Sequence, residues 1–262
     1  MQCKSPETTL IVLAHPEPRS FNGAWAQASV EASEAIGHKV LYADLVSMGF
    51  DPVEKASHYR HLTAVDLSSP FDPLLMQELA AREQCLPADV APHVLNIRSA
   101  QRIIFHFPLW WFGPPAVLKG WLDRCLVHGE LHTNVQRFDA GSCVGKKAIF
   151  CVSTGSTAME SSPAGKEGHV TMLLWPLAYS LRYLGFTVLQ PKIVHGVHGY
   201  HQDAAKTELE NRLRRIILEQ RELISEFDDW PIIQFNRDDD FDENGVLRPS
   251  AASHSSFIRH RT

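Results

Sequence analysis

Short apolar runs alternate with longer amphipathic stretches through most of the chain. Each run is the length of a strand, and nearly continuous apolar character is typical of parallel strands buried on both faces. The predicted strands are 8–14, 39–43, 103–107, 148–152 and 186–189. The predicted helices are 23–36, 74–84, 88–99, 115–127, 169–184 and 202–226. Trp175-Pro176 predicts a break within the helix 169–184, because proline removes a backbone donor. Five strands alternating with helices predict an α/β fold built on a doubly wound parallel sheet.

Three of the predicted strands end in loops with distinctive composition. After the first strand, residues 14–23 read AHPEPRSFNG and lead into a helix, whose first N–H groups and dipole favour an anion. Ser20 and Asn22 are suited to binding phosphate or simply to capping the helix, and Arg19 adds a positive charge. The first loop is therefore a candidate phosphate site, with helix capping as the simpler alternative.

The loop after the strand 103–107 is aromatic, and the loop after 148–152 is rich in hydroxyl groups. Residues 108–113 read PLWWFG before the next helix restarts at Pro114-Pro115. Aromatic rings at the carboxyl end of a strand are suited to covering a flat ligand, unless they are ordinary core. Residues 153–157 read STGST, where Gly155 allows close approach of the backbone to a ligand.

Two polar excursions and a polar tail accompany this core. Residues 45–75 and 128–145 lack clear periodicity, and the first is expected to contain a helix or two. We divide the chain into a domain over 1–226 and a C-terminal extension over 227–262. Beyond Trp230 the extension has too few apolar residues to fold alone, which favours a disordered tail. Phe257-Ile258 indicate the alternative, that it lies across another surface.

Composition narrows the class of protein. The chain has 262 residues, 44% hydrophobic and 21% charged, as is typical of a soluble globular protein. A net charge of −5 gives no reason to expect nucleic acid or an anionic membrane as a partner. No run approaches a membrane span, and the first residues do not resemble a signal peptide. The five cysteines form no CxxC pair, which favours a reduced, cytoplasmic protein.

The sequence predicts no metal site. His195, His198 and His201 recur at three-residue intervals, but two glycines separate them and no cysteine or carboxylate ligand set accompanies them. The motifs GxGxxG, GxxxxGK[ST] and GxSxG are also absent. Their absence argues against a Rossmann dinucleotide domain, a P-loop NTPase and an α/β-hydrolase.

The amino-acid sequences of these loops resemble those of one known family. AHPEPRSFNG (14–23), FPLWWFGPPAVLKGWLDR (107–124), STGS (153–156) and GHVTMLLWPLAYSLRYLGF (168–186) occur in the order found in the flavodoxin-like NAD(P)H:quinone oxidoreductases. The resemblance covers roughly residues 8–200. It implies a flavodoxin-like doubly wound five-stranded parallel sheet with a C-terminal extension.

The resemblance also implies a flavin site. His15, Arg19, Ser20, Phe21 and Asn22 match the segment that holds the phosphate and ribityl chain. Pro108, Leu109, Trp110, Trp111 and Phe112 match the segment beside the isoalloxazine. Ser153, Thr154, Gly155 and Ser156 match the loop over its pyrimidine side, where backbone N–H groups such as that of Gly155 stabilise negative charge on the reduced ring. FAD is preferred to FMN, while NADH and NADPH both remain possible as hydride donor.

The chain departs from the family at the positions that the resemblance would assign to charge movement during hydride transfer. Ser161 and Glu167 stand where mammalian members have a tyrosine and a histidine, and His132 and Asn134 replace two pocket tyrosines. Glu167 and His132 are therefore candidates for stabilising the charge that develops on the reduced ring during hydride transfer. The alternative is that both merely line a polar pocket. Phe186 matches a pocket position, but core packing is the preferred reading.

The resemblance implies an enzyme that passes a hydride from NAD(P)H through the flavin to a quinone-like acceptor in a ping-pong cycle. It also implies a homodimer whose site is completed by the second subunit. The alternatives are a flavin-binding ancillary subunit in which turnover is secondary, or an azo- or nitro-reductase.

Overall fold

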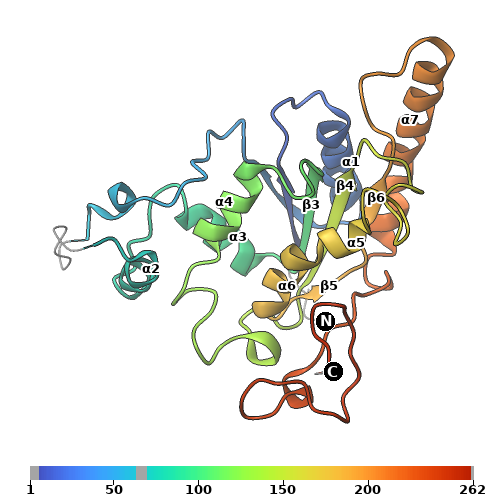
Figure 1. Cartoon of the computed structure of the whole chain (residues 1–262). Coiled ribbons are helices and arrows are strands. Elements are labelled where there is room, and N and C mark those ends of the chain that lie inside the picture. Colours follow the sequence, from blue (N-terminus) through green and yellow to red (C-terminus); the bar gives the residue numbers. More distant parts are fainter. Residues whose placement is uncertain (1–5, 63–69, 261–262) are drawn as a thin grey trace, which may run out of the picture.

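The computed structural model describes residues 6–62 and 70–260 and has a parallel sheet at its centre (Figure 1). Within these ranges the strands are β1 (Thr8–Leu13), β2 (Lys39–Asp44), β3 (Arg102–Pro108), β4 (Lys147–Ser153), β5 (Thr187–Val188) and β6 (Lys192–Val194). Their order is β2-β1-β3-β4-β5, with β6 also pairing with β4, and every pair is parallel. The doubly wound α/β prediction is confirmed.

The fifth strand position is split between β5 and β6. β5 pairs with Lys147 and Ala148 at the start of β4, whereas β6 pairs with 151–153 at its end. Pro191, directly before β6, has no N–H to donate to a ladder. The sequence analysis predicted the first half of this strand and missed β6.

Helices cover both faces of the sheet (Figure 1). α1 (Phe21–Ala35) and α7 (Asp203–Ser225) pack over one face, where Trp25 lies in a core with Ile11 and Ile104. α3 (Ala91–Ser99), α4 (Ala116–Cys125) and α6 (Trp175–Tyr183) cover the other, where Trp121 packs with Phe105. Adjacent residues of a strand face opposite sides, so one apolar run supplies both cores.

The remaining helical segments lie between or beyond these layers. α2 (Pro73–Arg82) confirms the helix predicted over 74–84. The excursion expected over 45–75, of which 63–69 lies outside the described residues, contains a 3-10 turn. α5 (Val170–Leu173) precedes α6, and the expected break before Pro176 is confirmed. Short 3-10 turns occupy Ala56–Tyr59, Phe138–Ala140 and Asp238–Asp240.

A buried polar network ties α1 and α7 to β3. Trp25 Nε1 donates to Gln220 Oε1 at 2.6 Å, and Gln220 Nε2 donates to Ser29 Oγ at 2.8 Å. Ser29 Oγ lies 2.9 Å from His106 Nε2. All four side chains are at most 2% exposed, so the network fixes α1 against the sheet in one position.

The C-terminal extension is ordered, which supports the second of the two interpretations drawn from its composition. Phe257 stacks on Trp175 with 4.5 Å between ring centroids. The backbone N–H of Asp238 donates to Asp139 Oδ2 at 2.7 Å, while Arg182 pairs with Asp139 Oδ1. The extension therefore lies along α6 and the 128–145 excursion, held by aromatic stacking and by a shared carboxylate.

Two findings from the described part of the chain bear on the expectations about membrane spans and disulfides. Among its helices, none combines the length and apolar character that crossing a bilayer requires. Its four cysteines, Cys85, Cys125, Cys143 and Cys151, are all free thiols.

Candidate functional site

The three loops singled out in the sequence meet at the carboxyl edge of the sheet. Asn22 Nδ2 donates to Ser153 Oγ at 2.7 Å, which joins the start of α1 to the end of β4. The N–H of Leu109 donates to the carbonyl of Ser153 at 2.7 Å, and the rings of His15 and Trp110 lie 5.8 Å apart. The loops flank the point where strand order reverses between β1 and β3, which is where ligands bind in this topology.

The first loop presents free backbone donors at the start of α1. Ser20 caps the helix by accepting from the N–H of Gly23 at 3.2 Å. The N–H groups of Phe21 and Asn22 have no acceptor within the described residues, and Asn22 Oδ1 is buried without a partner. Together with the helix dipole, these N–H groups are able to hold an anion such as a phosphate.

Arg19 is committed to a neighbour rather than to this anion position. Its guanidinium donates to both carboxylate oxygens of Glu17, at 2.9 and 3.0 Å, and its side chain is 89% exposed. The hydrogen bonds from Arg19 lower the pKa of Glu17 to about 2. The backbone alone therefore supplies the positive potential at the start of α1 unless Arg19 leaves Glu17.

The aromatic loop is a tight turn with an unusual backbone. Trp110 and Gly113 exchange two backbone hydrogen bonds, at 2.9 and 3.0 Å. The two residues between them, Trp111 and Phe112, have φ values of 50° and 62°. Left-handed φ at consecutive bulky residues costs about 1–2 kcal/mol each. Such strain persists where the surrounding structure or function requires it.

The turn holds its rings out of the core. Trp111 is 95% exposed, Phe112 53% and Trp110 45%. The alternative interpretation of these rings as core residues is therefore wrong. Three exposed rings on one turn form a shelf suited to a flat, apolar ligand.

The hydroxyl loop forms the wall beside this shelf. Thr154 Oγ1 lies 2.9 Å from Ser156 Oγ, which in turn contacts Ser161 Oγ at 2.5 Å. The N–H of Gly155 has no acceptor within the described residues, and a side chain at Gly155 would meet nothing closer than 3.9 Å. A free donor in open space is available to a ligand.

The shelf and the wall enclose a cavity of about 470 Å³, a size typical of small-molecule sites. Eight predicted site residues line it: Leu109, Trp111, Phe112, Thr154, Gly155, Ser156, Ser161 and Glu167. Glu160 and Leu173 also line it and were missed by the sequence analysis. The sequence did carry a signal for Glu160: it follows Thr157 by three residues, which is the spacing of a local capping turn.

The other predicted residues support the site from outside the cavity or lie elsewhere. His15, Ser20, Phe21, Asn22, Pro108, Trp110 and Ser153 belong to the loops that meet there but do not line the cavity. Phe21 stacks on Trp25 at 5.1 Å. Phe186 is 2% exposed and packs in the core, as preferred from the sequence.

His132 does not reach the cavity of its own chain. Its Nε2 lies 3.0 Å from the carbonyl oxygen of Leu126, and its ring packs edge-on against Tyr183 and His128. Burial and the neighbouring His128 lower the pKa of His132. Asn134 likewise lies outside the lining residues and is exposed.

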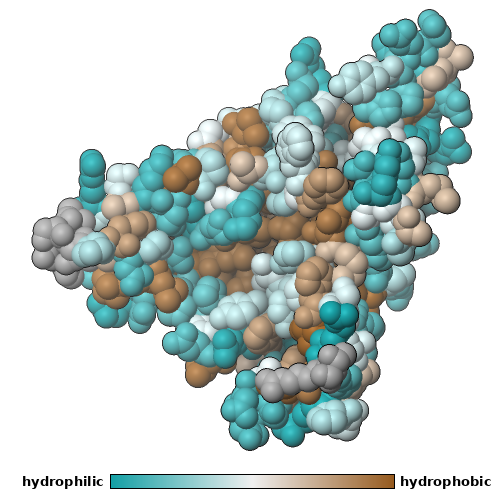
Figure 2. Space-filling view, in the orientation of Figure 1, coloured by the Kyte–Doolittle hydropathy of each residue, from teal (hydrophilic) through white to brown (hydrophobic). Residues whose placement is uncertain are grey.

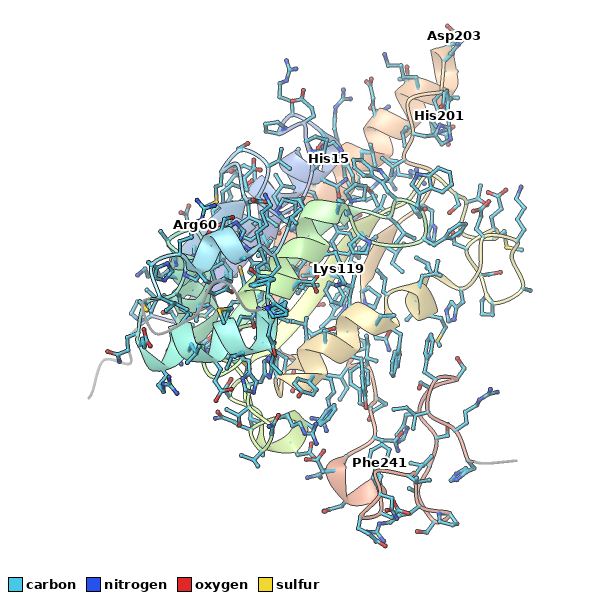
Figure 3. The ribbon with its side chains drawn as sticks, turned by 60° about the vertical axis from the view of Figure 1, so that its left-hand side comes forward. His15, Arg60, Lys119, His201, Asp203 and Phe241 are labelled. Atoms are coloured by element: carbon cyan, nitrogen blue, oxygen red, sulfur yellow. The ribbon has the colours of Figure 1, made fainter. Side chains whose placement is uncertain are left out.

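The spaced histidines are not gathered with other possible ligands. The rings of His198 and His201 stack 4.0 Å apart, and no group of three or more potential ligands occurs among the described residues. Figure 3 shows His15 and His201 towards the same end of the molecule and Phe241 at the opposite end.

We expect the strain in the aromatic turn to be measurable. Trp111→Asn should raise the free energy of unfolding of the ligand-free protein by about 1 kcal/mol, because asparagine tolerates left-handed φ and the exposed indole contributes little packing. Trp111→Ala removes the same indole but keeps the strain, so it should leave stability nearly unchanged. Urea denaturation measures both. Equal stability of the two variants would contradict strain at this position.

Comparisons with known proteins agree with this architecture. The sequence profile of a family described as having a flavodoxin-like fold matches residues 7–217. Rat NAD(P)H dehydrogenase [quinone] 1 is 36% identical over 209 residues, covering 79% of this chain and 75% of that protein. Human ribosyldihydronicotinamide dehydrogenase [quinone] is 37% identical over 187 residues, covering 70% and 79%. A crystal structure of a candidate quinone reductase from Klebsiella pneumoniae superposes with a TM-score of 0.82 at 28% identity, covering 95% of this chain and 97% of that one.

Proposed function

The chain belongs to the flavodoxin-like NAD(P)H:quinone oxidoreductase family, and we propose that it binds FAD at the three loops and transfers a hydride from NADH or NADPH to a quinone-like acceptor. The observation that carries this proposal is the exposed shelf of Trp111 and Phe112 facing the free N–H of Gly155 across one cavity. A flat ring with a polar edge matches both walls.

The residues present fit a flavin. The free N–H groups of Phe21 and Asn22 would receive the phosphate, and the buried, unpartnered Asn22 Oδ1 is available to a hydroxyl of the ribityl chain. Trp111 and Phe112 would support the ring face, with Thr154, Gly155 and Ser156 at its polar edge. When bound, the flavin supplies the two-electron chemistry.

The protein's own part in the reaction is positioning and charge stabilisation. The hydride donor and the acceptor would enter the same partly open cavity in turn, as a ping-pong cycle requires. The N–H of Gly155 would stabilise negative charge at the polar edge. Ser161 and Glu167 stand at the relay positions, where Ser161 contacts Ser156 and Glu167 is free to face a bound ring.

A second cavity supports FAD over FMN. It has a volume of about 360 Å³, lies between residues 157–158 and α7, and is lined by His195, His201 and Arg212 among others. His195 Nδ1 is buried there without a partner. An adenosine group extending from the phosphate would find stacking and hydrogen-bonding partners in this cavity, whereas FMN would leave it empty.

The proposal includes a homodimer whose interface covers the site. Figure 2 shows a hollowed region of hydrophobic residues at the centre of this face, between the helices labelled α4 and α6 in Figure 1. Trp111 stands almost fully exposed in the single chain, which is costly for an indole unless a ligand or a second subunit covers it. Because His132 lies outside the cavity of its own chain, any role in charge transfer would have to come from the second subunit's copy.

We assign the enzyme to the cytoplasm. The free thiols of Cys85, Cys125, Cys143 and Cys151 support a reducing compartment. Cys3 lies outside the described residues.

The test is spectroscopic. Purified protein should carry a yellow chromophore whose released flavin has the mass of FAD. NADH or NADPH should bleach it within seconds, and a neutral naphthoquinone should restore the colour. Stable flavin without bleaching would favour the ancillary-subunit alternative, and faster reoxidation by azo or nitro compounds would favour a reductase of those acceptors. A protein that takes up neither flavin would overturn the proposal.

A further inference from the structure

The charged side chains that line the cavity are both carboxylates. Among its lining residues the only ionisable side chains are Glu160 and Glu167, and no lysine, arginine or histidine lines it within the described part of the chain. Glu160 pairs at 3.1 Å with Lys166, whose side chain is 73% exposed.

The two carboxylates differ in how far they are neutralised. Glu160 Oε2 accepts from the N–H and the hydroxyl of Thr157 at 3.1 and 3.0 Å, while Oε1 faces Lys166. These hydrogen bonds, first that from the Thr157 backbone, lower the pKa of Glu160. Glu160 is therefore held ionised, but much of its charge is matched by an adjacent ammonium.

Glu167 is the less neutralised of the two carboxylates: the Lys166 ammonium attracts it and this attraction contributes to the raised pKa of Lys166, but the two side chains form no ion pair. The Glu167 side chain is half-buried, and its carboxyl accepts no hydrogen bond and makes no ion pair within residues 6–62 and 70–260. The backbone does hold the residue in place, because the N–H of Glu167 donates to the carbonyl of Glu160 at 3.0 Å. An anchored carboxylate that faces a partly enclosed cavity attracts cationic ligands and repels anionic ones. Salt and water screen this interaction less than they screen a charge on the open surface.

We propose that Glu167 sets the charge preference of the acceptor site: neutral and cationic ring acceptors are used, and anionic ones of the same size are rejected. Glu160 and Lys166 together modulate this preference. The inference rests on the proposed function, since it concerns the acceptor that shares the flavin cavity. It assigns Glu167 to specificity rather than to proton transfer.

Matched acceptors and variants test the proposal. The ratio of kcat/KM for 1,4-naphthoquinone-2-sulfonate to that for neutral 1,4-naphthoquinone is measured in the flavin-loaded protein. Because the same two compounds are compared in every variant, their intrinsic reactivities cancel. Glu167→Gln should raise this ratio by about tenfold, and Glu167→Lys by considerably more. Lys166→Met, which unpairs Glu160, should lower it by roughly threefold.

The control is Glu222→Gln, which removes an exposed carboxylate near the C-terminal end of α7 that does not line the cavity. It makes the same change in net charge and should leave the ratio unchanged. High salt should narrow the difference between Glu167→Gln and the unmodified protein. An unchanged ratio in both Glu167 variants, or an equal change in Glu222→Gln, would overturn the proposal.

A binding measurement separates this inference from the proposed function. Redox-inert naphthalene-2-sulfonate and neutral 2-naphthamide are titrated into the protein, with quenching of tryptophan fluorescence as the readout. The affinity for the sulfonate relative to the amide should rise about tenfold in Glu167→Gln. If the protein fails to reduce any quinone, the proposed function fails while these affinities still decide the role of Glu167. If it reduces the neutral quinone but the relative affinities do not change, only the charge preference fails.

Discussion

Gly23→Ala is expected to abolish tight flavin binding. A Cβ at this position would lie 1.9 Å from the carbonyl oxygen of Pro18 and 2.7 Å from its carbonyl carbon. Both are backbone atoms, so the loop 15–20 would have to move away from α1. That movement would displace the Ser20 cap and the free N–H groups of Phe21 and Asn22, on which phosphate binding depends.

The expected magnitudes are a loss of at least a hundredfold in flavin affinity and about 2–3 kcal/mol in the free energy of unfolding. Flavin titration of the apoprotein and urea denaturation measure the two. Gly199→Ala is the control, since nothing lies within 4 Å of a Cβ there. Unchanged flavin affinity in Gly23→Ala would show that the first loop does not hold the phosphate.

The location of the candidate site could be predicted because it depends on where the strands end. The apolar runs that become β1, β3 and β4 are each followed by a chemically distinct loop, and parallel strands bring such loops to one edge. The sequence left the exposure of Trp111 open, because the rings that follow the strand could also have packed in the core; the structure shows the indole to be 95% exposed. The free N–H of Gly155 follows from its place in the third loop.

Features that depend on distant partners were not predictable in the same way. His132 was expected at the site, but its ring packs against Tyr183 on α6. The order of the C-terminal extension depends on Phe257 meeting Trp175, a contact between segments 82 residues apart in sequence (257 − 175). No local pattern encodes these contacts.

His106 is another residue whose environment only the structure shows. It is the fifth residue of β3, is 0% exposed, and contacts Ser29 at 2.9 Å through Nε2 while Nδ1 is buried without a partner. Its ring packs edge-on against Trp25, with centroids 5.2 Å apart. No charged group is among the partners of this ring in the described part of the chain. Burial therefore lowers the pKa of His106 from 6.5 to about 3.

Acid should destabilise the protein through this histidine. Between pH 6.5 and about 3 the unfolded chain binds a proton that the folded chain excludes, so the free energy of unfolding falls as pH falls, by about 1.4 kcal/mol per pH unit. His106→Leu should lower the free energy of unfolding at pH 7 by about 1 kcal/mol, because the contact with Ser29 is lost. It should also reduce the slope of that free energy against pH by the contribution of one proton. Urea denaturation at a series of pH values gives both slopes.

Ser29→Ala is the matched control, since it loses the same contact but keeps the buried imidazole and should keep the steep slope. Parallel stability curves for His106→Leu and the unmodified protein would show that His106 takes up its proton in the folded state, and that the network joining α1, α7 and β3 tolerates a charge at its centre.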